Sequence, residues 1–183
     1  MIVGLTGMPG SGKGVFVETA KKKGFDVVRM GDAVWEYVKK KGLTLNDENV
    51  GGVADEERKK HGYGIWAERT LPFIKNRKTV IDGIRSIEEV GIFKSHFQDF
   101  IVIGVHSSPE TRYRRIMKRK RIDDTFSKED FDERDKRELS WGIGEVIALA
   151  DGVIVNEGSI GEFERKVKEI LNKVQENPFG EIF

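Results

Sequence analysis

The chain has 183 residues, enough to bury a substantial core and within the size of one domain that carries an inserted segment. Its 32 basic and 31 acidic residues give a net charge of +1, so no global field favours a nucleic-acid or membrane partner. The absence of cysteine excludes disulfides and thiolate metal sites, and three histidines disfavour a histidine-rich zinc site.

No apolar run approaches the roughly 20 residues that a membrane-spanning helix requires. We therefore expect one domain over residues 1–183, located in the cytoplasm, that acts as a monomer or a small homo-oligomer.

A glycine-rich loop follows the first apolar run, MIVGLT. Successive backbone N–H groups in such a loop, aimed by the first turn of a helix, form an anion site, and a lysine completes it with a mobile ammonium. The spacing G-x-x-x-x-G-K is typical of a nucleotide-binding P-loop when it follows a strand and opens a helix. The residues expected to bind the nucleotide here are Gly7, Met8, Pro9, Gly10, Ser11, Gly12, Lys13, Gly14 and Val15.

Gly14 stands where a P-loop usually supplies a Ser or Thr hydroxyl to magnesium. Magnesium must then be held by water, nucleotide oxygens and a carboxylate elsewhere in the chain. The loop resembles that of adenylate kinases, which also carry Gly after the Lys but commonly continue with Thr, where this chain has Val15. The resemblance implies kinase chemistry with ATP and Mg²⁺ as cofactors.

The next segment contains a predicted helix, a strand and a mainly helical insertion. The helix should run from Lys13 to about residue 23, and a strand over 25–30 should lead to Asp32 at the edge where catalytic loops lie. The pattern from about 32 to 77 predicts helices, with one ending near Gly42, a break over 49–52 and a kink at Pro72.

We interpret this insertion as an acceptor-binding flap, and the alternative is a plain helical insertion. Arg58 is its candidate contact with the acceptor. Asp32 is either a base for a hydroxyl acceptor or only a helix cap, and both interpretations stay open.

A short buried strand over 79–82 ends in the tetrad Asp82-Gly83-Ile84-Arg85. A carboxylate at a strand end beside a P-loop is where such kinases hold magnesium, which makes Asp82 the metal and catalytic candidate. The tetrad resembles the Asp-Gly-Phe-Pro-Arg signature of adenylate kinases, shortened by one residue. The resemblance implies that Arg85 clamps the acceptor phosphate with its planar fork, and the alternative is a surface arginine.

Residues 100–105 form the clearest strand, apolar on both faces, and Ser108-Pro109 should start a helix rich in cations. These cations form either a nucleic-acid face or a solvated surface. With the acidic stretch 123–138, the region resembles the lid of dephospho-CoA kinases and nucleoside monophosphate kinases. The resemblance implies a lid over about 120–140 in which Arg119 and Arg134 close over the transferring phosphate, while the other cations are solvated.

Residues 147–159 resemble the last strand of dephospho-CoA kinases, and the resemblance places Asn156 beside the adenine. A final amphipathic helix should cover 160–174. The combined resemblance covers essentially the whole chain and identifies an archaeal-type P-loop kinase related to both families. It implies an α/β, nucleoside-monophosphate-kinase-like, three-layer fold with a five-stranded parallel sheet in the order 2-3-1-4-5.

The leading functional hypothesis is an ATP-dependent phosphotransferase that acts on a nucleotide-like acceptor, a small molecule. The alternatives are phosphorylation of a hydroxyl in the manner of dephospho-CoA kinase, and an ATP-binding switch or assembly factor with slow ATPase activity. RNA binding by the basic helix is a further option. A GTPase is disfavoured because no Asn-Lys-x-Asp string occurs.

Overall fold

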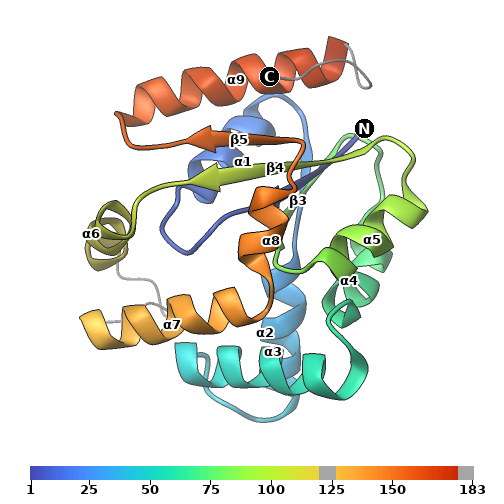
Figure 1. The fold of residues 1–183 in the computed structure, drawn as a ribbon. Coiled ribbons are helices and arrows are strands. Elements are labelled where there is room, and N and C mark those ends of the chain that lie inside the picture. Colours follow the sequence, from blue (N-terminus) through green and yellow to red (C-terminus); the bar gives the residue numbers. More distant parts are fainter. Residues whose placement is uncertain (120–126, 177–183) are drawn as a thin grey trace.

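A parallel sheet of five strands organises the molecule (Figure 1). The computed structural model describes residues 1–119 and 127–176. The strand order is β2-β3-β1-β4-β5, as expected. β1 lies at the centre because its apolar residues are buried on both faces, as in a sheet covered by helices on each side. The strands are β1 (Ile2–Thr6), β2 (Asp26–Arg29), β3 (Thr79–Ile84), β4 (Phe100–His106) and β5 (Gly152–Val155).

Helices cover both faces of this sheet and make three layers. On one face, α1 (Lys13–Lys22) packs against α9 (Ile160–Glu176), whose predicted apolar stripe from Phe163 to Val174 is buried. The other face is covered by α2 (Met30–Lys40), α5 (Ile87–His96) and α8 (Ile143–Ala148), with Trp66, Phe93 and Trp141 in its core.

The insertion between β2 and β3 is helical, but its internal break was predicted wrongly. α3 (Asp47–His61) runs without interruption through residues 49–52. The Asn46 side chain caps it by accepting a hydrogen bond of 2.8 Å from the Asn49 amide. A Cβ on Gly51 would lie 2.5 Å from the Arg137 guanidinium carbon, so this glycine permits a close approach of another element.

The prediction that Asp32 caps a helix is also wrong. α2 begins at Met30, directly after the last residue of β2, and Asp32 lies inside its first turn. The strand therefore passes into the helix without a loop, which leaves the Asp32 carboxylate only partly exposed near the ends of the strands. The kink at Pro72 is confirmed, since α4 (Ile65–Thr70) gives way to a 3₁₀ turn over Leu71–Phe73.

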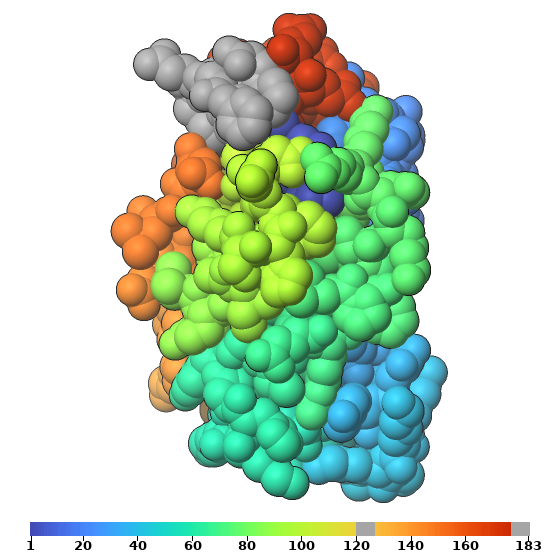
Figure 2. Space-filling view, turned by 90° about the vertical axis from the view of Figure 1, so that its right-hand side faces the viewer, coloured from blue at the N-terminus to red at the C-terminus, as the bar shows by residue number. Residues whose placement is uncertain are grey.

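The α3–α4 segment and α5 form one continuous face of the molecule in Figure 2, coloured teal to yellow-green. α7 (Lys128–Ser140) lies beside α3, and α6 (Pro109–Arg119) precedes it in the chain. Residues 120–126, where the predicted lid begins, and the tail 177–183 lie outside the described residues. In the part of the chain that the structure describes, no helix is long and apolar enough to cross a membrane.

Candidate active site

The loop between β1 and α1 has the backbone of a phosphate-binding loop. Gly7, Gly10 and Gly12 have φ angles of 148°, 82° and 112°, which residues with side chains rarely adopt. A Cβ on Gly7 would lie 2.4 Å from the Val105 carbonyl oxygen. Lys13 Nζ donates hydrogen bonds to the Gly7 carbonyl and, over 3.3 Å, to the Met8 carbonyl, which places the ammonium over the loop.

Several of the predicted residues contribute to one electrostatic field at Lys13. Burial lowers its pKa from 10.5 to about 8; Asp82 and Glu138 oppose this shift, whereas Arg85 and Arg119 add to it. The charges of the β3 carboxylate and of two arginines that the sequence places in different motifs therefore act on the loop lysine. Glu138 was not among the predicted residues.

Asp82 lies in β3 directly beside the strand that leads into the phosphate loop, paired in register with Leu5. Its Oδ1 is buried and has no hydrogen-bond partner in the described structure. A buried carboxylate oxygen without a partner, next to a phosphate loop, fits a magnesium ion and its water shell. No cluster of three or more His, Cys, Asp or Glu residues that could hold a metal occurs among residues 1–119 and 127–176. The metal would therefore depend on nucleotide oxygens as well as on Asp82.

Asp32 faces the same region from the first turn of α2. Partial burial raises the pKa of its carboxyl, the Asp82 charge adds to this effect, and Arg29 opposes it. A carboxylate with a raised pKa near the transfer site is suited to accept a proton from a hydroxyl.

A bulge at the end of β3 directs Arg85. The pairing register with β1 shifts there, so that Thr6 pairs with Ile84, and Gly83 has a φ of 108°. Thr6 Oγ1 fixes this turn by donating a hydrogen bond of 2.8 Å to the Ile84 carbonyl. Arg85 Nη1 folds back to donate to the Gly83 carbonyl over 2.6 Å.

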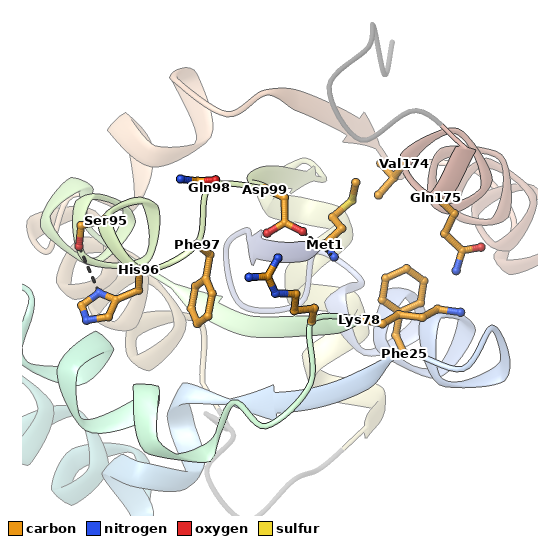
Figure 3. Close-up of a pocket in the computed structure, with 11 residues that line it drawn as sticks. Met1, Phe25, Lys78, Ser95, His96, Phe97, Gln98, Asp99, Val174 and Gln175 are labelled. Atoms are coloured by element: carbon orange, nitrogen blue, oxygen red, sulfur yellow. Dashed lines mark hydrogen bonds and ion pairs between the residues drawn. The ribbon is translucent and has the colours of Figure 1, made fainter.

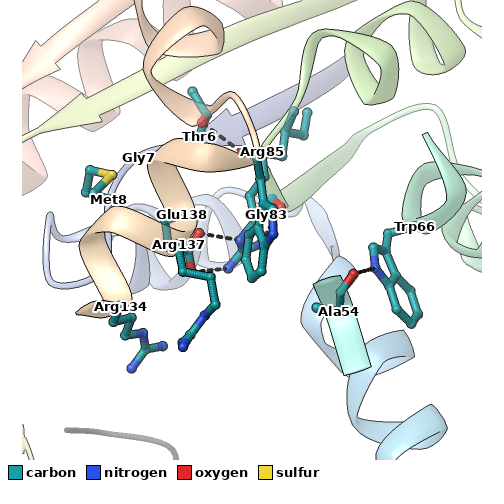
Figure 4. Close-up of polar contacts among 12 residues, drawn as sticks. Thr6, Gly7, Met8, Ala54, Trp66, Gly83, Arg85, Arg134, Arg137 and Glu138 are labelled. Carbon is teal, nitrogen blue, oxygen red and sulfur yellow. Dashed lines mark hydrogen bonds and ion pairs between the residues drawn. The ribbon is translucent and has the colours of Figure 1, made fainter. Parts of the chain in front are cut away.

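Arg85 is paired with a carboxylate of α7. Its Nε donates to Glu138 Oε2 over 2.6 Å and its Nη2 donates to Glu138 Oε1 over 3.4 Å (Figure 4). Burial alone would raise the pKa of Glu138, but the charges of Arg85 and Arg134 and the hydrogen bond from Arg85 lower it to about 2. The predicted acceptor clamp is therefore bound to an internal anion in this structure.

A small cavity of about 90 Å³ lies between α2, α3 and α7. Its walls combine guanidinium groups with two indole rings and include Arg58, Arg85, Arg134, Arg137, Trp35 and Trp141. Arg58 is almost fully buried: its Nη2 pairs with Glu89 Oε1 over 2.9 Å, and its guanidinium carbon lies 4.4 Å from the centre of a Trp141 ring.

Contacts from α7 to α3 close one side of this cavity. Arg134 Nε lies 3.2 Å from Asp47 Oδ1, and Arg137 Nη2 donates to Asp47 Oδ2 over 2.7 Å. Arg134 and Arg137 point from the same helix in Figure 4. The predicted flap and the predicted lid are therefore joined by ion pairs.

Two arginines of α6 were wrongly expected to be solvated. Arg112 is 3% exposed; it donates to the Pro9 carbonyl over 3.1 Å and pairs in bidentate fashion with Asp135 of α7. Arg115 Nη1 donates to Ser107 Oγ over 2.9 Å. These side chains support the phosphate loop from behind. The spacing of the basic residues along α6 gave no signal of this role, because the partners lie in other elements.

Asn156 supports the same loop. Its Nδ2 donates to the Ser11 carbonyl over 2.9 Å, and a Cβ on Gly12 would lie 2.2 Å from that nitrogen. The resemblance placed this residue beside adenine, and in the structure its side chain bonds to the phosphate loop from the end of β5.

A second cavity, of about 670 Å³, lies at the opposite ends of the strands (Figure 3). It is lined by Phe25, Lys78, Phe97 and Val174, and by Met1, whose amino group pairs with Asp99 over 2.8 Å. None of the predicted site residues lines it.

Comparisons with known proteins agree with this geometry. A family model described as an AAA domain matches residues 6–132. A UPF0200 protein of Thermococcus onnurineus is 44% identical to this chain, and the match covers 95% of this chain and 98% of that protein. A UPF0200 protein of Thermoplasma volcanium is 45% identical, and the match covers 91% of this chain and 94% of that protein.

Solved structures with the same fold include TT1252 from Thermus thermophilus, with a TM-score of 0.66, 21% identity and coverage of 95% of this chain and 97% of that one. A shikimate kinase from Acinetobacter baumannii, in complex with shikimate, has a TM-score of 0.61 and 17% identity, with coverage of 94% and 93%. A gluconokinase from Sinorhizobium meliloti has a TM-score of 0.56 and 18% identity, with coverage of 96% and 93%. The fold is thus that of P-loop kinases, and the chain belongs to the UPF0200 family.

Proposed function

We propose that this protein is an ATP-dependent phosphotransferase that acts on a nucleotide-like small-molecule acceptor. The observation that carries the proposal is the phosphate loop with Lys13 folded over it, beside the buried and unpartnered carboxylate oxygen of Asp82 on the neighbouring strand. Thr6, just before the loop, bonds to the Ile84 carbonyl, and the next residue, Arg85, lines the cationic cavity, so a donor site and an acceptor site would adjoin. Transfer of a phosphoryl group needs this arrangement, because its catalysis consists mostly of positioning and electrostatic stabilisation.

On the donor side, the loop amides and Lys13 would hold the β- and γ-phosphates of ATP. Asp82 would hold magnesium through water, and the bound ion would neutralise charge on the phosphate oxygens. Arg119 and Arg134 would stabilise the charge on the group in transfer. Arg112, Arg115 and Asn156 bond to the loop or to its neighbours, and would keep its carbonyl groups turned away from the phosphates.

On the acceptor side, the cavity between α2, α3 and α7 offers guanidinium groups for an anion and the rings of Trp35 and Trp141 for a flat group. A nucleotide carries both kinds of group. Proteins with the same fold include a shikimate kinase bound to shikimate and a gluconokinase, which supports a small-molecule acceptor.

A hydroxyl acceptor is the second candidate, and the position of Asp32 favours it. A phosphate acceptor is already ionised and needs no base, whereas a hydroxyl must lose a proton during transfer. The raised pKa of Asp32 and its proximity to Asp82 suit that task.

The test is a coupled assay of ADP release with nucleoside monophosphates and dephospho-CoA as acceptors. Acceptor-dependent release that disappears in Lys13→Met supports the proposal. Asp32→Asn then separates the two acceptor types, since it should abolish transfer to a hydroxyl and spare transfer to a phosphate. ADP release at the same slow rate with and without every acceptor would instead favour an ATPase switch.

A further inference from the structure

Arg85 uses all three of its guanidinium nitrogens inside the protein. One bonds to the Gly83 carbonyl, and the other two bond to the two oxygens of Glu138. An arginine grips a phosphate through the same pair of parallel N–H groups that it offers to a carboxylate. Glu138 therefore occupies the edge of Arg85 that an acceptor phosphate would need.

Glu138 is a charged group at neutral pH, although its side chain is only 4% exposed. It comes from α7, whereas Arg85 follows β3, so the pair joins two elements that are separated by 53 positions in the chain. The field of Glu138 also reaches Lys13. A single anion thus compensates cations of both the donor side and the acceptor side.

We propose that Glu138 is an internal substitute for the anionic group of the acceptor, and that a phosphate monoester binds Arg85 by displacing this carboxylate. The inference rests on the proposed function and adds a residue that controls the affinity for the acceptor. Retaining both anions on one edge of this partly buried guanidinium would place like charges in contact, which is unfavourable where solvent screening is weak. Entry of the acceptor must therefore move Glu138 away.

Glu138 lies in the last turn of α7, so the release of its carboxylate from Arg85 removes the bonds that tie this end of the helix to the segment after β3. α7 is held in its present position by the contacts of Arg134 and Arg137 with Asp47 of α3. The exchange of anions on Arg85 would therefore be coupled to the contact between these two helices. Binding of the acceptor would loosen α7 at Glu138.

The first experiment measures the affinity for inorganic phosphate while ADP saturates the phosphate loop. Glu138→Gln keeps the size of the side chain and removes the competing charge, so the Kd for phosphate should fall by about tenfold or more, within the usual range of coupling between sites. Glu133→Gln, an exposed position on the same helix, is the matched control and should leave the Kd unchanged.

A double variant, Glu138→Gln with Arg85→Gln, tests whether the gain depends on Arg85. The gain should disappear in it. A folded Glu138→Gln protein with unchanged phosphate affinity would overturn the proposal, and so would a gain that persists in the double variant.

A second experiment uses the unaltered protein and applies even if Glu138→Gln does not fold. With ADP present, phosphate should accelerate amide hydrogen exchange over residues 134–140, because α7 must release Arg85. Slower exchange or no change in that stretch would refute the displacement. Neither readout needs turnover, so a protein that passes both tests but transfers no phosphate would disprove the proposed function and leave this inference intact.

Discussion

The affinity for nucleotide should fall as the pH rises above 8, because Lys13 begins to lose its proton in the free protein. Its pKa there is about 8, against the usual 10.5. Bound phosphates would restore the higher pKa, because an adjacent negative charge favours the protonated ammonium. Below pH 8 the free protein already carries this proton, and above it binding must take up a proton from the solvent.

The size of the effect follows from linkage. At about pH 9.5 only about 3% of the free protein retains the proton on Lys13, so the affinity should be about 30-fold weaker than at neutral pH. The same depressed pKa has a consequence for folding. The unfolded chain binds the proton between pH 8 and 10.5 while the native state does not, so this residue makes stability rise with pH in that window.

Isothermal titration calorimetry with ADP, from about pH 7 to pH 9.5, measures the affinity directly. Repeating it in buffers of different ionisation enthalpy counts the protons taken up, which should approach one per nucleotide at the upper end. Lys13→Arg is the control, since a guanidinium stays charged throughout and should remove the pH dependence. An affinity for the unaltered protein that is constant within twofold over this range would refute the reasoning.

Three further predictions concern side chains of α3, α6 and α7. Arg134→Ala should lower kcat on the order of 10³-fold and change ATP affinity little, because its charge would serve the transition state; steady-state kinetics against the exposed control Lys136→Ala checks this, and an unchanged kcat would contradict it. Asp47→Asn should weaken the contact between α3 and α7 and speed amide hydrogen exchange in α7. Equal exchange rates in the variant and the unaltered protein would contradict the idea that this contact holds α7 in place. Arg112→Ala should reduce the free energy of unfolding by about 3 kcal/mol, because it leaves a carboxylate and a carbonyl without their partner; urea denaturation should show no such loss in the exposed control Arg114→Ala, and equal losses in both would show that burial of the pair is unimportant.

Local patterns in the sequence were sufficient for the individual strands and for the phosphate loop. The phosphate loop was recognisable because its glycines and lysine lie within one short segment. Their spacing places glycine where the backbone needs a positive φ angle. The strand order came from the family resemblance and is confirmed. The apolar stripe of α9 was also evident, since burial of a helix face depends on periodicity within one segment.

Errors arose where a residue serves a contact between elements. Gly51 looked like a break, but its missing side chain admits Arg137 from α7. Arg112 looked solvated because it lies in a run of cations, but it bonds to the phosphate loop and to Asp135. A single sequence does not specify which distant carboxylate or carbonyl a given side chain will meet.

The sequence by itself determined the phosphate loop, the place of Asp82 in a buried strand and the presence of Arg85 after that strand, because each depends on neighbours along the chain; β3 continues two residues beyond the predicted end, to Ile84. Only the tertiary structure decided that Glu138 binds Arg85 and that Asp47 holds α7 against α3. These pairings join segments 53 and 90 positions apart. Their physical basis is the need of each charge withdrawn wholly or partly from water for a partner of opposite sign, and folding selects that partner by proximity in space.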